Sequence, residues 1–375
     1  VLLPAYLLTL GFGTWEVGFL STATLLGSAL ATLAVGTWGH RFQHRHLLLG
    51  AALLMTATGL CFSGLSGFWP LLLIAFVGTL NPSSGDVSVF LPLEHARLAE
   101  SARGDARTVL FARYSLLGAL FAALGALATA VPEWLTAHAG LTQLAALRGM
   151  FVFYALIGAV VWWLYRGLPE APTHDQTPPA PLTSSRSVVF RLAALFSIDA
   201  FAGGLVVNTL LALWLFQRFE VSLTSAGAFF FWAGLLTAAS QLAAPVVARR
   251  IGLLNTMVFT HIPANVCLIL AALAPNLPLA LGLLLVRALL SQMDVPTRSA
   301  FVMAVVTPAE RAAAASFTAV PRSLAAALSP SLGGALFATG WLAAPLLACG
   351  ALKIAYDLML WRSFRRIERR IKPAT

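Results

Sequence analysis

Nine ionisable side chains lie inside apolar runs of this sequence, where a charge is costly. They are Asp86, Arg113, Asp199, Arg287, Asp294, Arg298, Arg322, Lys353 and Asp357. Ionisable groups at bilayer depth are rare and usually mark ion or substrate pathways. An acid in such surroundings can carry a proton, because desolvation favours its neutral form. A buried base can hold an anionic group.

Two of these residues fall near the middle of their runs. Counting 1.5 Å per residue, Asp199 and Arg287 each lie about 12 Å from the start of their helix. Asp199 is the predicted proton or cation site. Arg287 has no local partner, so we expect it to bind substrate or take part in coupling, unless a neighbouring helix supplies a structural partner. The predicted substrate and coupling residues are Asp199, Arg287, Asn81, Ser84, Asn208 and Gln292.

Four charges are predicted to form a gate between two halves of the chain. By the same helical count, three of them lie near one membrane boundary, and acids of one half could meet bases of the other there. The alternative is that they form static pairs within each half or extend to the interface. The predicted gate residues are Asp86, Arg113, Asp294 and Arg322.

Three local patterns are expected to be structural or to line a cavity. The pairs Asp294–Arg298 and Lys353–Asp357 have the i,i+4 spacing of ion pairs on one helix face. Residues 81–86 form a polar break, NPSSGD, that is tolerated at membrane depth only beside protein or a water-filled cavity. A Pro kink satisfied by the two serines is the alternative.

The capping box Thr307–Glu310 marks the start of a helix, and we expect no further role for it.

The elements that position these residues are membrane helices. Of 375 residues, 59% are apolar and 10% are charged, and the mean hydropathy is +0.84. A soluble domain carries about 25% charged residues. The composition excludes a soluble enzyme, a nucleic-acid-binding domain and a single-span receptor. Twelve spans are predicted: 1–12, 15–35, 47–65, 69–91, 108–131, 149–165, 190–216, 226–247, 255–274, 279–302, 309–339 and 342–361. Because the first is short, we expect the chain to begin partway through helix one.

The chain divides into two halves of six helices each. Residues 166–187 are rich in Pro, Ser and Thr and are typical of a solvated linker. A shift of 209 superposes Arg41 on Arg250 and Arg113 on Arg322. The predicted domains are 1–165, a cytoplasmic linker 166–187, and 188–375 with a basic tail. Arg and Lys gather in alternate loops and in this tail, which predicts cytoplasmic termini.

The loop after the second span resembles the signature of the major facilitator superfamily. It reads GTWGHRFQHRH over residues 36–46, and His40 stands where that family usually has Asp. The signature residues are Gly36, Gly39, His40, Arg41 and Arg45. The resemblance covers the whole chain and implies twelve transmembrane helices in two pseudo-symmetric six-helix bundles. It also implies secondary transport, with this loop helping to close the cytoplasmic side.

A second element of the family occurs in an unusual helix. Proton antiporters of the family carry Gly-Pro-x-x-Gly-Gly in helix five, whereas this chain has Ser329-Pro-Ser-Leu-Gly-Gly334 in helix eleven. Pro frees a carbonyl and paired glycines let helices approach closely, so a bend or tight crossing is expected there.

Three classes of function follow from these observations. The first is proton-coupled export of a small organic solute by alternating access, and the second is an uptake carrier or facilitator for a polar or anionic metabolite. A non-transporting membrane sensor is the third. No enzyme motif, cofactor site or metal site is predicted, and the expected partners are a small-molecule substrate, protons or another coupling ion, and lipid. We expect no nucleic-acid partner and a monomer in the cell membrane, namely a bacterial inner membrane.

Overall fold

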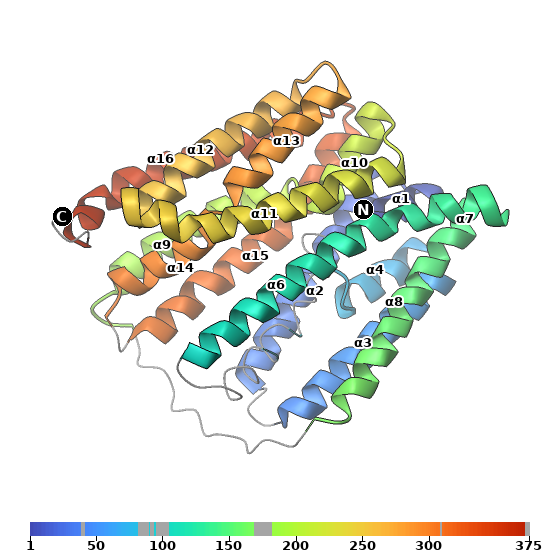
Figure 1. Cartoon of the computed structure of the whole chain (residues 1–375), viewed down its shortest axis with the longest axis horizontal. Helices are drawn as coiled ribbons and strands as arrows, with labels where there is room; N and C mark the ends of the chain where they lie inside the picture. Colours follow the sequence, from blue (N-terminus) through green and yellow to red (C-terminus); the bar gives the residue numbers. More distant parts are fainter. Residues whose placement is uncertain are drawn as a thin grey trace. The chain divides into compact units, whose positions relative to one another are not determined.

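The structure is a computed structural model that describes residues 1–38, 42–81, 90, 94, 105–168, 182–307 and 310–371. Within these ranges every regular element is a helix (Figure 1). The helices are α1 (Leu2–Thr9), α2 (Thr14–Trp38), α3 (His44–Gly64), α4 (Phe68–Val77), α6 (Asp105–Leu127), η2 (Ala128–Ala130), α7 (Val131–Ala139), α8 (Gln143–Tyr165), α9 (Arg186–Gly204), α10 (Asn208–Phe219), α11 (Leu223–Ile251), α12 (Leu253–Ala272), α13 (Leu277–Ser291), α14 (Asp294–Val305), α15 (Arg311–Ala338) and α16 (Ala344–Ile371).

These helices carry the twelve predicted spans. Nine segments of the described residues are long and apolar enough to cross a membrane. The short α1, the short α4 and the long, less apolar α15 account for the other three. The all-α membrane fold predicted from the sequence is confirmed.

Two spans are built from paired helices. The span 186–219 contains α9 and α10, which are separated at Leu205–Val207, and the span 277–305 contains α13 and α14, which meet at Gln292. Interrupted helices at membrane depth are tolerated where the freed backbone lines a cavity or is covered by protein. The second interruption immediately precedes Asp294, whereas Asp199 lies within α9, more than one helical turn before the first interruption.

The described helices form two compact units. Unit 1 comprises residues 1–176, 207–228 and 330–338, and unit 2 comprises 177–206, 229–329 and 339–375. Unit 1 therefore includes short pieces of the predicted second half. The boundaries 1–165 and 188–375 remain a sequence prediction.

Unit 1 is held by close helix crossings and uncharged hydrogen bonds. A Cβ added at Gly27 of α2 would lie 1.6 Å from the carbonyl oxygen of Phe76, so only glycine permits this crossing with α4. The Tyr6 hydroxyl donates to the Phe62 carbonyl at 2.7 Å, and the Thr79 and Tyr154 hydroxyls share a hydrogen bond of 2.8 Å.

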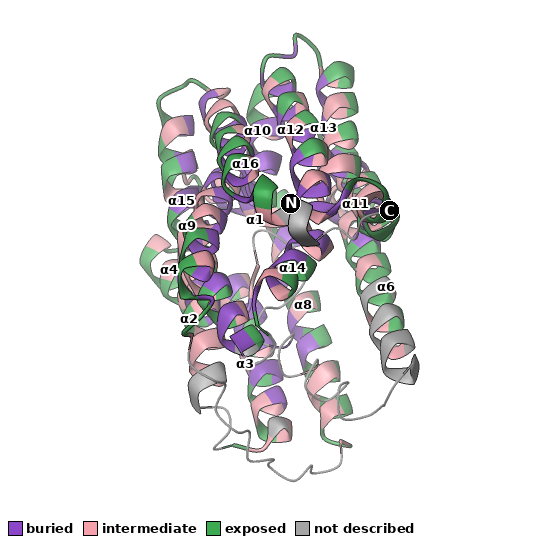
Figure 2. Ribbon diagram, turned by 90° about the vertical axis from the view of Figure 1, so that its left-hand side faces the viewer, coloured by how far each residue is buried: buried purple, intermediate pink, exposed green. Residues whose placement is uncertain are grey.

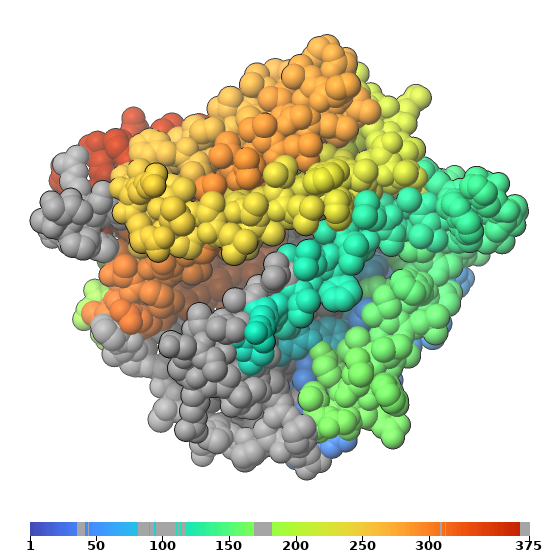
Figure 3. All heavy atoms as spheres, in the orientation of Figure 1, coloured from blue at the N-terminus to red at the C-terminus, as the bar shows by residue number. Residues whose placement is uncertain are grey.

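Unit 2 packs α12 against α13 and α16 around a large apolar cluster. Its buried core includes Phe196, Phe301, Tyr356 and Phe364. Buried, intermediate and exposed residues alternate along most helices (Figure 2). In α11, which crosses the face seen in Figure 3, Trp232 and Leu242 are 57% and 74% exposed, as expected of positions that face lipid.

Candidate functional site

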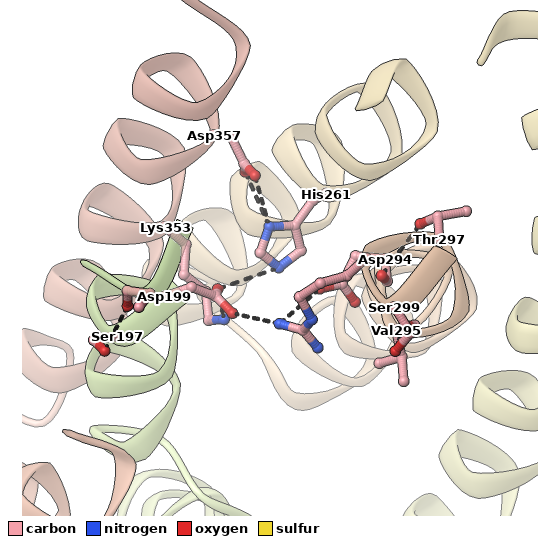
Figure 4. A network of polar contacts seen from close by, with 11 residues as sticks. Ser197, Asp199, His261, Asp294, Val295, Thr297, Ser299, Lys353 and Asp357 are labelled. Carbon is pink, nitrogen blue, oxygen red and sulfur yellow. Dashed lines mark hydrogen bonds and ion pairs between the residues drawn. The ribbon is translucent and has the colours of Figure 1, made fainter. Parts of the chain in front are cut away.

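Asp199 is the centre of a buried charge network in unit 2 (Figure 4). Helix α9 buries this residue to 4% exposure. The Lys353 ammonium of α16 donates to Oδ1 of Asp199 at 2.5 Å, and Nη1 of Arg298 from α14 donates to Oδ2 at 3.3 Å. Two cations on one carboxylate favour its ionised form.

His261 of α12 joins two acids of the network. Its Nδ1 lies 3.0 Å from both carboxylate oxygens of Asp357, and its Nε2 lies 4.0 Å from Oδ1 of Asp199 (Figure 4). The imidazole and the Asp357 carboxyl are both buried. An imidazole between two carboxylates can hold a proton on either nitrogen.

Arg298 connects the network to Asp294 at the start of α14. Nη1 of Arg298 lies 3.4 Å from Oδ2 of Asp294, so the i,i+4 pair expected from the sequence is confirmed. The guanidinium also lies over the Phe196 ring, 5.6 Å from its centroid.

The pair expected between Lys353 and Asp357 is wrong. Each residue turns to a different helix: Lys353 binds Asp199 of α9, and Asp357 binds His261 of α12. The physical reason is that α16 is buried between both helices at this level, so each side chain reaches a partner more directly opposite. Lys353 and Asp357 therefore belong to the charge network and do not form an ion pair with each other within α16.

The bonded set has an uneven charge that a proton can change. It contains three carboxylates, one guanidinium, one ammonium and one imidazole. Its members are Asp199, Asp294, Asp357, Arg298, Lys353 and His261. With a neutral imidazole the sum is −1, and with a protonated imidazole it is 0. The imidazole of His261 faces both Asp357 and Asp199, so a proton added there lies between two carboxylates.

Arg322 lies beside this network without a bond to it. The described residues offer it no hydrogen bond or ion pair, and its Nε is buried without a partner. It interacts electrostatically with Arg298, Asp199 and Asp294. The buried hydroxyl of Tyr356 also lacks a hydrogen-bond partner in this part of the chain.

Arg287 lies in α13 and forms no ion pair with the described residues of the network around Asp199. Its Nε is buried and has no partner among the residues that the structure describes. Its electrostatic neighbours are the thiols of Cys349 in α16 and Cys267 in α12. The geometry therefore does not join Arg287 to Asp199, and its role in coupling or binding remains a prediction.

The other predicted residues are scattered or fall outside the described ranges. Gln292 ends α13, Asn208 begins α10, Asn81 follows α4, and Arg113 is exposed on α6. Gly36 lies in α2, and Nη2 of Arg45 donates to the Arg166 carbonyl at 2.8 Å. Outside the described residues lie Ser84, Asp86, Gly39, His40 and Arg41.

Glu310 does more than start a helix, which corrects the sequence expectation. Its carboxylate accepts hydrogen bonds from the backbone N–H groups of Thr183, Ser184 and Ser185 at 2.6, 2.9 and 3.0 Å. These bonds and the one from the Thr183 hydroxyl lower the pKa of Glu310 well below its usual range. The residue fixes the end of the linker at the start of α9.

Unit 1 contains a closed junction between helix ends that are far apart in sequence. A Cβ at Gly18 of α2 would lie 2.6 Å from the Pro330 carbonyl oxygen and 2.9 Å from Cα of Gly334. The tight crossing expected at residues 329–334 is therefore confirmed. The Thr22 hydroxyl accepts a bond of 2.9 Å from the Ser331 N–H.

A second contact fastens the same end of unit 1. The Glu133 carboxylate accepts from the N–H groups of Leu223 and Thr224 at 2.5 and 3.0 Å, at the start of α11. An acid at a helix N-terminus satisfies free donors and complements the helix dipole.

The sequence model of the Major Facilitator Superfamily matches residues 1–293. An uncharacterized membrane protein of Saccharomyces cerevisiae is 24% identical over 351 residues, which cover 84% of this chain and 78% of the yeast protein.

Two solved structures illustrate the fold. The nucleoside transporter NupG is similar with a TM-score of 0.73 and 15% identity, over 97% of this chain and 94% of its own. The inward-open xylose transporter XylE from E. coli has a TM-score of 0.70 and 16% identity, over 93% and 86%. At this identity both comparisons concern the fold alone.

Proposed function

Because this chain belongs to the major facilitator superfamily, we propose that it moves a small organic solute across the membrane by alternating access, coupled to protons. The family makes it a membrane transporter and not an enzyme. The coupling ion and the solute are the parts that are proposed.

The observation that carries the proposal is the uneven charge of the buried network. Burying ion pairs is weak evidence for stability, since apolar residues of similar size often stabilise as well. A set of six ionisable groups at one level of unit 2 therefore calls for another reason. Uptake of one proton on His261 changes the charge of these six groups by one, as a coupling site requires.

The closed junction of unit 1 supports alternating access. It joins α2 to residues 330–338 and α7 to the start of α11 through small residues and backbone hydrogen bonds. The contacts of Gly18 and Thr22 with residues 330–334 involve no charged side chain, so they can separate without exposing a charge to lipid. A transporter needs one closed side at a time, and we propose that these contacts close one side.

Export is the direction that we propose first. The Pro and Gly element at residues 329–334 supports it, since it resembles an element of proton antiporters. The second candidate is an uptake carrier or facilitator for a polar or anionic metabolite, favoured by the guanidinium of Arg322, which has no ion pair among the described residues. We further propose cytoplasmic termini, a bacterial inner membrane and a monomer.

Proteoliposome flux tests the proposal. The purified protein is reconstituted, and solutes from a metabolite panel are added with and without a pH gradient while a trapped dye reports internal pH. Proton-coupled transport predicts solute and proton movement that depend on each other. A facilitator predicts solute movement without protons, and a sensor predicts neither.

A further inference from the structure

We propose that Arg322 is an anion-binding group, so that the transported solute carries a carboxylate, phosphate or sulfonate next to the charge network of unit 2. The inference rests on the proposed transport function and names the chemical class of its substrate. It differs from the gate role expected of Arg322 from the sequence.

Helix packing places Arg322 at the level of Asp199. A Cβ at Gly204 of α9 would lie 2.5 Å from the Ala326 carbonyl oxygen and 2.0 Å from the Ser329 hydroxyl of α15. Both helices follow a predicted cytoplasmic loop and run in the same direction. Asp199 and Arg322 precede this crossing by about 8 Å each, at 1.5 Å per residue.

No residue in the described part of the chain forms an ion pair with the Arg322 side chain. A guanidinium removed from water is costly unless it is paired and hydrogen-bonded. Arg298, which interacts electrostatically with Arg322, is paired with Asp199 and Asp294. Arg322 has no counterion among the described residues, and part of its side chain is exposed. Guanidinium groups bind carboxylate and phosphate oxygens in a bidentate manner.

The charges around Arg322 link anion binding to proton binding. With Arg322 included, three carboxylates face three permanent cations, and the sum is 0 when His261 is neutral. A proton on His261 raises it to +1, which an anion beside Arg322 neutralises. The other group that faces this cluster from α16 is the Tyr356 phenol. Proton and anion should therefore each raise the affinity for the other, as linkage requires.

Thermal-shift titration of the full-length purified protein tests this inference without requiring transport. The probes are benzoate, phenyl phosphate and benzenesulfonate, each compared with an uncharged analogue: benzamide, phenol and benzenesulfonamide. We expect at least one anion, and not its analogue, to raise the melting temperature. Arg322→Gln should weaken its binding about 10- to 100-fold, as expected for a charge-assisted hydrogen bond.

Two further variants keep the result interpretable. Arg322→Lys retains the charge and should recover part of the affinity even where Arg322→Gln is poorly folded. Arg218→Gln removes the same charge from an exposed position on α10 and should bind as the wild type does. Benzenesulfonate, which does not titrate between pH 5 and 8, should bind more tightly as the pH falls.

The outcomes separate this inference from the proposed function. If no anion stabilises the protein, or if Arg322→Gln binds the anion as tightly as wild type, the anion site is wrong even if proton-coupled flux of a neutral solute is found. Anion binding at Arg322 in a protein that moves no protons would retain the site and contradict the coupling.

Discussion

The two units solve the same packing problem with different chemistry. In unit 1 the carboxylates accept from neutral donors: Glu133 from backbone N–H groups, and Glu94 from the hydroxyls of Tyr114 and Tyr165. In unit 2 the carboxylates of Asp199 and Asp294 meet cations. Among the residues that the structure describes, Glu133 and Glu94 of unit 1 thus meet neutral donors where Asp199 and Asp294 of unit 2 meet cations.

The internal repeat makes the contrast sharper. A shift of 209 carries His261 to Ala52 and Lys353 to Leu144. Architecture repeats between the halves, whereas this chemistry does not. The network of unit 2 is best understood as functional, and the contacts of unit 1 with neutral donors as structural.

Breaking one ion pair in unit 2 should produce the largest change in stability. Lys353→Met leaves Asp199 under-compensated, and removing one partner of a buried pair costs about 3–5 kcal/mol. Combining it with Asp199→Asn should restore most of the loss, because both charges are then gone. Thermal unfolding in detergent measures both, and Arg362→Met, an exposed position on α16, is the matched control. Equal losses in the single and double variants would mean that packing, and not charge, is responsible.

Forcing apart the closed junction should have the next largest effect. Gly18→Val places side-chain atoms where the Pro330 carbonyl lies, and overpacking of this kind costs about 1–3 kcal/mol. We expect faster labelling of a cysteine at position 14 by an impermeant thiol reagent, in a background without the native cysteines. Gly50→Val is the control, since nothing lies within 4 Å of a Cβ there. Unchanged labelling would show that this junction does not gate access.

Removing an uncharged contact of unit 1 should matter less. Tyr154→Phe deletes the hydrogen bond with Thr79, and such a bond contributes about 1 kcal/mol. The melting temperature should fall slightly, and proton coupling should be unchanged. A loss of proton coupling in this variant would contradict the assignment of a structural role to unit 1 and of coupling to unit 2.

The smallest change in melting temperature is expected on replacing Glu310, whose carboxylate holds the end of the linker, and this change depends on pH. Hydrogen bonds lower the pKa of Glu310 from its ordinary value of 4.5, so its ionised form stabilises the folded chain at neutral pH. The stabilisation is fully present above pH 4.5, the ordinary pKa of the group, and is lost as the pH falls through the lowered pKa of the folded state. Wild type should therefore melt above Glu310→Gln at pH 7, and the two should converge in acid. A constant difference across the pH range would contradict the ionic role.

Much of the fold and part of the site could be predicted from the sequence. Charges within apolar runs identified Asp199, Asp294 and Arg298, because the cost of burying a charge does not depend on packing details. The sequence did not identify His261, although it interrupts the apolar run 255–274. It also could not pair Lys353 with Asp199, since helices that are apolar on all sides do not reveal which face meets which neighbour.

The most direct test follows proton and solute together in proteoliposomes for wild type, Asp199→Asn and His261→Gln. Wild type should accumulate solute in response to a pH gradient and move protons with it. Both variants should still exchange solute across the membrane at equal pH, while the proton movement and the accumulation are lost. If either variant retains full pH-driven accumulation, the charge network of unit 2 is not the coupling site.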